Sequence, residues 1–306
     1  MKEYNFNFYS DANLKSYNLN ESIRYQLGML DSLDAFTRRH SENVAALACR
    51  LCEKLHMRSY FTVYCTTCAY LHDIGKQFIP PNILQKNGPL TDEEYEIMKT
   101  HTTIGYKICM ADLKLRPFAN GALYHHEALN GTGYPNGATA KEIPLEGKII
   151  RVADEFDAIV SKRQYKSHVG ICDTLKILLD EITPSMVSKK SIDKLNKIEP
   201  KIFKALVKTV IEDTEYEIGC LIDYIKYLKD NIIRLEKVIQ YKEKFDKIEK
   251  EAERKKFLKG MQILFEIGEN FDNCLQVLAE YNEALVVRSA ELTKLCKELK
   301  NIKKMK

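Results

Sequence analysis

The sequence has no long hydrophobic run. Hydrophobic residues make up 45% of its 306 residues and charged residues 29%, yet no apolar stretch reaches the ~20 residues of a membrane-spanning helix. The first residues, MKEYNFNFYSDANLKSYNLN, lack the apolar segment of a signal peptide. We therefore expect a cytoplasmic protein with no membrane span, and enough apolar side chains for a sizeable core.

The last hundred residues lack proline and have few glycines. All eight prolines lie at or before position 200. The glycines beyond that point are Gly219, Gly260 and Gly268. Such a change in composition is typical of a domain boundary. We predict an N-terminal extension (1–20), a first domain (21–212) and a helical, heptad-containing region (213–306).

No segment alternates polar and apolar residues as a strand does, so an all-α fold is expected. Thr91-Asp92-Glu93-Glu94 is a capping box. It should open one helix that carries His101 on its apolar face. Further helices are predicted from Phe61 to His72, from Phe118 to Glu127 and from Pro144 onward. Gly75 should let the chain turn after the helix that ends at His72, and 130–137 is a loop rich in glycine.

Apolar residues recur four and three apart in the C-terminal region, as in helices that pack lengthwise. The first series is Leu221, Ile225, Leu228, Ile232, Leu235 and Ile239. The second is Leu264, Ile267, Phe271, Cys274, Leu278, Tyr281, Leu285, Leu292, Leu295, Leu299 and Ile302. The pattern fits a helical bundle within one chain as well as a coiled coil that makes a homodimer.

Neither charge nor cysteine content indicates a special class. The net charge of +4 does not indicate a nucleic-acid partner, and no DNA binding is expected. Nine cysteines in a long chain with no export signal should be reduced thiols. The pairs Cys49/Cys52 and Cys65/Cys68 have the spacing of zinc ligands, but they lie in apolar helical sequence, where buried thiols are the better interpretation.

Histidines and aspartates recur through the first domain in the manner of a metal site. The candidate ligands are His40, His72, Asp73, His101, His125, His126 and Asp154. A single histidine is usually a surface or core residue, and His56 and His168 are interpreted so. Five histidines within about 90 residues, each next to apolar helical sequence, favour a centre for metals such as Fe, Mn or Zn.

The doublet His72-Asp73 is the most informative part of this series. Adjacent residues on a helix point about 100° apart, so both can face one cavity only where the helix ends or the packing opens. A carboxylate has two oxygens, so Asp73 could bridge two metals. Two metals about 3.5–4 Å apart form a clamp for hydrolysis of phosphoryl esters.

The motifs His72-Asp73-Ile74-Gly75-Lys76, His125-His126-Glu127 and Gly133-Tyr134-Pro135 occur in the order found in the HD-GYP family, a branch of the HD metal-dependent phosphohydrolases. The sequence resembles that family over roughly residues 25–183. The resemblance implies an HD-type helical domain with the seven ligands above.

The same resemblance implies a bacterial cyclic di-GMP phosphodiesterase that releases linear pGpG, in some members followed by GMP. A hydroxide bridging the metals would attack phosphorus. Asp73 and Lys76 would be the catalytic residues. Lys76 would contact a phosphate, and the basic pair Arg163 and Lys166 would hold phosphate and guanine-side groups. The loop Gly133-Tyr134-Pro135 would contact the substrate or partner proteins.

Three departures from the family pattern refine this expectation. Phe36 stands where many members have a glutamate that holds a third metal, so two divalent metals, Fe or Mn, are expected, and pGpG more than GMP as product. Asn130 replaces a common aspartate and Ala128 a common basic residue, which bears on substrate affinity. Two other functions stay open: hydrolysis of another cyclic dinucleotide or phosphoester, and a sensor that binds the dinucleotide without cleaving it.

Overall fold

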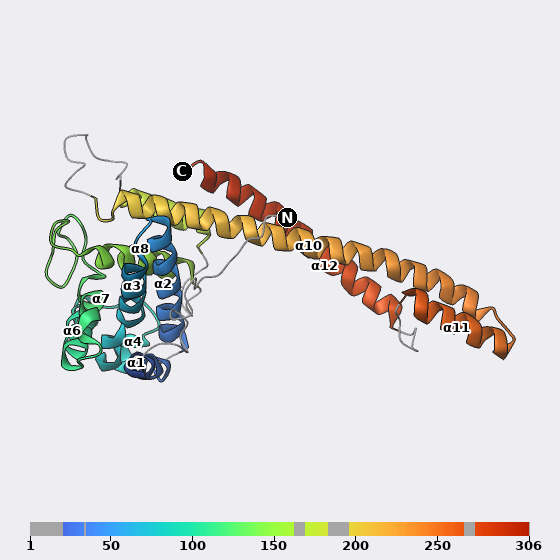
Figure 1. Ribbon diagram of the computed structural model, residues 1–306, viewed down its shortest axis with the longest axis horizontal. Helices are drawn as coiled ribbons and strands as arrows, with labels where there is room; N and C mark the ends of the chain where they lie inside the picture. The colour runs from blue at the N-terminus through green and yellow to red at the C-terminus, as the bar shows by residue number, and fades with distance from the viewer. Residues whose placement is uncertain (1–20, 34, 162–168, 183–195, 266–272, 306) are drawn as a thin grey trace. The chain divides into compact units, whose positions relative to one another are not determined.

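The computed structural model describes residues 21–33, 35–161, 169–182, 196–265 and 273–305 (Figure 1). These residues form α-helices and two short 3-10 helices, with no strand beyond an isolated bridge between Asn130 and Thr139. The predicted all-α fold is thus confirmed. Within the described part, no helix has the combination of length and apolar character that a bilayer crossing requires. The predicted extension 1–20 lies outside the described residues.

The described residues form two compact units, the first up to Ile211 together with 302–305, and the second from Glu212 to Asn301. The first unit contains the short helices of the chain. They are α1 (Glu21–Asp31), α2 (Ala35–Lys54), α3 (Ser59–Leu71), η3 (Ile74–Phe78), α4 (Pro81–Leu84), α5 (Asp92–Lys99), α6 (His101–Ala111), η4 (Arg116–Phe118), α7 (Ala119–Tyr124), α8 (Leu145–Val160) and α9 (Ile171–Asp180).

Helix α3 is the central helix of the first unit. It packs against α2, α7 and α8, and its residues from Cys65 to Leu71 are all buried. Side chains such as Tyr70, Leu51 and Ile149 are fully buried around it. Because the second half of α3 is buried on all sides, the residue that follows its last turn, His72, also lies in the interior.

The predicted capping box is present, since Glu94 N donates to Thr91 Oγ1 and Thr91 N donates to the Glu94 carboxylate. The prediction of one continuous helix after it is wrong, because the helix is broken at Thr100 into α5 and α6. Thr100 has ψ −17°, away from the ~−42° of an α-helix, and its hydroxyl donates to the Ile97 carbonyl at 2.6 Å. The break makes His101 the first residue of α6.

The second unit is built from the part of α10 (Pro200–Asp246) after residue 211, α11 (Glu251–Phe265) and α12 (Cys274–Lys303). Four members of the first apolar series, Ile225, Leu228, Ile232 and Leu235, are buried. Helices α10 and α12 lie side by side (Figure 1), with the rings of Tyr227 and Tyr281 6.5 Å apart. The apolar face of α10 is therefore covered within a single chain. The Leu264 side chain, Ile267 and Phe271 lie outside the described part.

Candidate metal centre

The fold brings all seven predicted ligands to one place inside the first unit. His40 comes from α2 and Asp154 from α8, both from within the helix. The other five stand at helix ends: His72 and Asp73 between α3 and η3, His101 at the start of α6, and His125 and His126 directly after α7. Helix ends aim adjacent side chains at a common point, as the doublets require.

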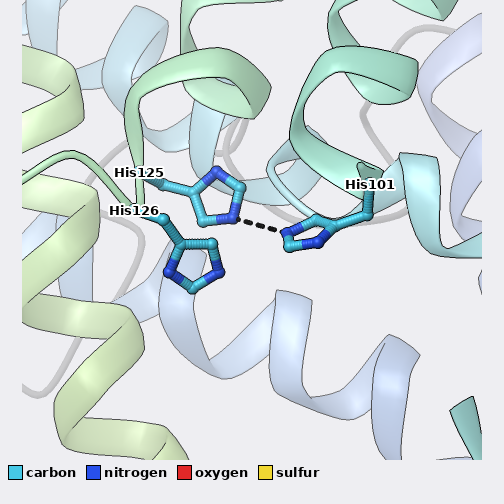
Figure 2. Close-up of side chains that lie close together, drawn as sticks. All are labelled: His101, His125 and His126. Carbon is cyan, nitrogen blue, oxygen red and sulfur yellow. Dashed lines mark hydrogen bonds between the residues drawn. The ribbon is translucent and has the colours of Figure 1, made fainter. Parts of the chain in front are cut away.

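The ligand atoms form two clusters. One contains His40, His72 and Asp73, and the other contains His101, His125 and His126 (Figure 2). Within each cluster the three ligand atoms lie within 4.8 Å of one another. All of these side chains are buried except that of His126, which is 23% exposed. Among the described residues, these are the groups whose spacing suits a metal ion.

The two oxygens of Asp73 face different clusters. Oδ2 lies 3.2 Å from His72 Nε2 and 3.8 Å from His40 Nε2. Oδ1 lies 3.5 Å from His101 Nε2 and 3.9 Å from His125 Nε2. This carboxylate stands between the clusters, as a bridging ligand must.

Asp154 also faces both clusters. Its Oδ1 lies 2.9 Å from His40 Nε2 and 3.9 Å from His72 Nε2. Its Oδ2 lies 3.8 Å from Nδ1 of His126. Two carboxylates therefore join the sets of imidazoles, which gives a donor set of nitrogen and oxygen atoms suited to first-row transition metals.

Backbone carbonyls orient three of the histidine rings. Nδ1 of His72 lies 2.6 Å from the Ala69 carbonyl oxygen, and Nδ1 of His101 lies 2.7 Å from that of Met98. Nδ1 of His125 lies 2.9 Å from the Ala122 carbonyl oxygen. A carbonyl oxygen only accepts, so each Nδ1 carries the hydrogen and each neutral ring presents an Nε2 lone pair to the centre, as metal-binding histidines do.

The orientation of these rings fits a bound cation. Nε2 of His101 lies 3.1 Å from Nε2 of His125 (Figure 2). With both rings neutral, two lone pairs face each other, which is repulsive unless a proton or a metal ion stands between the nitrogens. His72 Nε2 and Asp73 Oδ1 are buried without a hydrogen-bond partner. Buried polar atoms rarely lack a partner, and metal ligation would satisfy all four.

Asp157 supports His40 and was missed from the sequence. Its carboxylate accepts a hydrogen bond from His40 Nδ1 at 2.7 Å and from the Asn43 amide at 3.0 Å. The signal was available, because Asp157 follows Asp154 by three residues and therefore shares its helix face. A carboxylate behind a histidine fixes the ring and increases its basicity toward a metal.

The pKa values of most side chains in the site give, at neutral pH, the protonation states that bind metals. Burial raises the pKa of Asp73 and Asp154, but neighbouring histidines outweigh burial and hold both pKa values well below the usual range. Burial lowers the pKa of His101 to about 4 and that of His126 to about 3. Burial also lowers the pKa of His40, but hydrogen bonds to Asp154 and Asp157 raise it overall to about 9. Ionised carboxylates and neutral imidazoles are the metal-binding forms.

The predicted phosphate contacts are placed in part. Lys76 Nζ lies 2.5 Å from Asp73 Oδ2, so this ammonium group borders the centre and pairs with the carboxylate between the clusters. Arg163 and Lys166 lie outside the described residues, as does His168. Phe36 lies one turn before His40 on α2 and is 44% exposed.

The predicted loop closes over the cluster of three histidines. Tyr134 stacks on His126, with ring centroids 4.7 Å apart and an interplanar angle of 27°. Gly133 allows this approach, since a Cβ there would lie 2.5 Å from the His126 carbonyl oxygen. Asn130 Oδ1 accepts from Thr132 N at 3.1 Å, the turn-closing bond expected of the residue that replaces aspartate.

Glu127 holds the far side of this loop and was not predicted to have a role. It is 1% exposed, and its two oxygens accept hydrogen bonds from Asn136 N at 2.7 Å and Ala138 N at 2.8 Å. The sequence motif already contains this glutamate, directly after the two histidines. Its hydrogen-bond partners could not be predicted, because the path of the loop cannot be derived from the sequence.

Gly75 is needed for space. A Cβ at Gly75 would lie 1.9 Å from the His101 carbonyl oxygen, so a side chain would separate η3 from α6. Its φ is not in the left-handed region. The expected reason, a turn that requires glycine, is thus replaced by a close approach of two backbones that carry ligands.

The cysteine pairs are not part of these clusters. Cys49 and Cys52 on α2 and Cys65 and Cys68 on α3 are each 0% exposed. All four are free thiols, and burial raises the pKa of Cys49 to about 12. Cys65 lies against Cys52 of α2, whereas Cys68 lies against Gly121 of α7. Buried thiols of this kind pack as small apolar side chains.

Comparison with known proteins identifies the first unit. The HD domain family matches residues 26–182, about half of the sequence, and the chain belongs to this family. This match confirms the family membership predicted from the motifs. The His-Asp doublet for which the family is named is His72-Asp73, and Asp73 lies between the two clusters.

Several characterised relatives match the same region. A cyclic di-GMP phosphodiesterase of Thermotoga maritima is 39% identical over 188 residues, which cover 61% of this chain and 51% of the relative. The cyclic di-GMP phosphodiesterase PdeB of Borreliella burgdorferi is 33% identical over 63% of this chain and 46% of PdeB. The 3'3'-cGAMP-specific phosphodiesterase 3 of Vibrio cholerae is 32% identical over 60% of this chain and 37% of that enzyme. The match thus spans between 37% and 51% of the length of these relatives.

Proposed function

We propose that this protein is a metal-dependent phosphodiesterase that opens cyclic di-GMP to linear pGpG. The observation that carries the proposal is the position of Asp73, whose two oxygens face separate ligand clusters. A carboxylate so placed would serve both ions of a two-metal centre, and such centres suit in-line displacement at phosphorus. The characterised relatives supply the class of substrate.

Two divalent metals, iron or manganese, fit the donor set. One would be held by His40 and His72 and the other by His101, His125 and His126, with Asp73 and Asp154 shared. Bound at this site, such ions lower the pKa of water toward about 7 and stabilise charge on phosphoryl oxygens. The ionised carboxylates and the neutral rings of His101 and His126 are in the forms that bind, whereas His40 would release its proton on binding a metal.

Lys76 is the residue best placed to bind the scissile phosphate. Its ammonium group lies 2.5 Å from Asp73 Oδ2 and its side chain is 17% exposed, so it borders both the centre and solvent. A cyclic dinucleotide is a dianion, and a fixed cation here would orient the phosphate and offset charge in the transition state. Arg163 and Lys166 are proposed to complete this phosphate site.

The first product is proposed to be pGpG. Phe36 cannot ligate a metal, so the centre would hold two ions and cleave the first phosphodiester bond more readily than the second. Homodimer formation through the C-terminal helices, and binding of signalling partners at the Gly133–Pro135 loop, remain predictions. So does a sensor role, which would show binding without turnover.

Product analysis tests this proposal. The purified chain is loaded anaerobically with Fe(II) or Mn(II), incubated in parallel with cyclic di-GMP and 3'3'-cGAMP, and the products are separated by chromatography. We expect pGpG from cyclic di-GMP, at a higher kcat/KM than for cGAMP. A reversed preference would favour the function of the Vibrio relatives, and tight binding without product would favour a sensor.

A further inference from the structure

Two residues of α5, Tyr95 and Lys99, extend the metal centre outward. The Tyr95 ring lies edge-on to Tyr134 with centroids 6.3 Å apart. Lys99 Nζ lies 4.8 Å from the centre of the Tyr95 ring and 5.8 Å from that of Tyr134. Since Tyr134 stacks on His126, a continuous series of rings runs from the ligand cluster to the surface.

Packing does not account for Tyr95. Helix α5 has no buried residue, and Tyr95 is 44% exposed. Polar contacts fix the helix instead: the capping box at Thr91 and an ion pair between Lys86 and Glu94 at 2.5 Å. An exposed ring on a helix held in this way presents a face to whatever occupies the entrance.

The ammonium group of Lys99 can also contact a ligand at this entrance. Its protein partner is Glu96, at 2.6 Å, and the Glu96 side chain is 70% exposed. An exposed ion pair of this kind is worth little and exchanges readily for another acceptor. The ammonium group therefore stands beside an aromatic face with donors to offer to a ligand.

We propose that Tyr95 and Lys99, with Tyr134, form a purine subsite in which a base of the substrate stacks on Tyr95 and Lys99 donates to the acceptors O6 and N7 of guanine. Aromatic side chains stack on any base, whereas a cation at this edge favours guanine, because adenine presents an amino donor in place of O6. This inference rests on the proposed function, and it assigns guanine preference to α5.

Binding of nucleotides that contain no phosphodiester bond separates the two contributions without turnover. Calorimetry on the metal-loaded full chain would compare GMP, AMP and ribose 5-phosphate. Wild type should bind GMP at least about 10-fold more tightly than ribose 5-phosphate. Tyr95→Leu should weaken GMP and AMP about 10-fold and leave ribose 5-phosphate unchanged, and Tyr95→Phe should bind like wild type.

Lys99→Met should lower the preference for GMP over AMP by about 5- to 10-fold. The chain offers matched controls for both positions. Tyr60→Leu changes a tyrosine that is 71% exposed. Lys176→Met breaks an exposed ion pair with Asp173 that has the same three-residue spacing. Neither control should change any of the three affinities.

Three outcomes would overturn the purine subsite: no preference of wild type for GMP over ribose 5-phosphate, unchanged affinities in Tyr95→Leu, or equal weakening of all three ligands. Hydrolysis of cyclic di-GMP by the same wild-type preparation keeps the two ideas apart. Turnover without a base preference would overturn the subsite alone. A base preference with no turnover of any cyclic dinucleotide would overturn the proposed function and leave the subsite in place.

Discussion

In both Asp73 and Asp154, one carboxylate oxygen faces one group of histidines and the other oxygen faces the second group. At the scale of the residue, this division is what distinguishes a two-metal centre from two separate histidine clusters. The rings themselves are oriented from behind, by backbone carbonyls for three of them and by Asp157 for His40. Ligand geometry therefore depends on residues that would not touch a metal.

Asp157→Ala should weaken metal binding about 10- to 100-fold, because His40 would lose the acceptor that fixes its ring. Metal affinity can be measured by competition with a chromophoric chelator. Asp173→Ala removes an exposed aspartate that pairs with Lys176 and should bind metal like wild type. Equal affinity in Asp157→Ala and wild type would show that His40 needs no support.

The individual residues of the site were easier to predict from the sequence than its elements or their packing. Histidine and aspartate are rare in apolar helical sequence, so their recurrence pointed to His40, His72 and the other candidate ligands that the structure brings together. Asp157 and Glu127 were missed for a physical reason. Asp157 acts through His40, which lies 117 residues away in the sequence. Glu127 acts through nearby loop amides whose position depends on the path of the loop, and acidic residues near helices are otherwise unremarkable.

At the scale of the element, the centre depends on close approach between backbones. The segment from Asp73 to η3 touches the first turn of α6 where Gly75 meets the His101 carbonyl. The ends of α3, α6 and α7 must converge within a few ångströms to bring five ligands together, and small residues permit this.

Gly75→Ala should destabilise the metal-free protein by about 3 kcal/mol, the upper end of the usual cost of overpacking, because its Cβ would lie 1.9 Å from the His101 carbonyl oxygen. Urea denaturation followed by circular dichroism measures the change. Gly28→Ala is the matched control: a Cβ at Gly28 in α1 meets no atom within 4 Å. It should stabilise the helix by about 0.5–1 kcal/mol. Equal stabilities of the two variants would contradict the packing argument.

Glu127→Gln should loosen the loop that carries Tyr134, because the amide oxygen can replace only one of two carboxylate oxygens that accept from backbone N–H groups. A hydrogen bond to a charged group is worth about 1.5–3 kcal/mol. We expect a raised KM for cyclic di-GMP with metal content unchanged. Glu142→Gln alters an exposed carboxylate that also accepts from a backbone amide, Thr139 N, and should leave KM unchanged. An unchanged KM in Glu127→Gln would remove its role in the loop.

The elements were predicted in type but not in their boundaries. Periodicity indicated helices throughout, and Thr91 with Glu94 marked a true N-terminus. The break at Thr100 was not visible, since threonine is tolerated within helices and the apolar pattern continues across it. Tertiary packing of α6 against η3, which joins segments distant in sequence, accompanies the break.

At the scale of the whole molecule, the unit that contains the candidate metal centre and the C-terminal helical unit each include part of helix α10. The heptads predicted lengthwise packing, and α10 does bury its seam against its own chain. Periodicity could not decide between packing within one chain and between two, because either arrangement buries the same face.

Metal loading should raise the thermal midpoint of the full chain relative to protein in EDTA. A ligand that binds only the folded state stabilises it by about 2.7 kcal/mol at a concentration 100-fold above Kd, and the ligands here come together only in the fold. Circular dichroism measures both midpoints. Identical midpoints with Mn(II) and with EDTA would argue against a metal centre in the first unit.

The most direct test of the central claim is the number of metal ions bound per chain. Wild type and Asp73→Ala would be loaded anaerobically with Mn(II), freed of excess metal and measured by mass spectrometry of the metal, alongside assay of pGpG release. The account predicts two ions per chain in wild type, and in Asp73→Ala fewer ions and no pGpG. Two ions and full activity in Asp73→Ala would contradict a bridging role for this carboxylate and the two-metal mechanism with it.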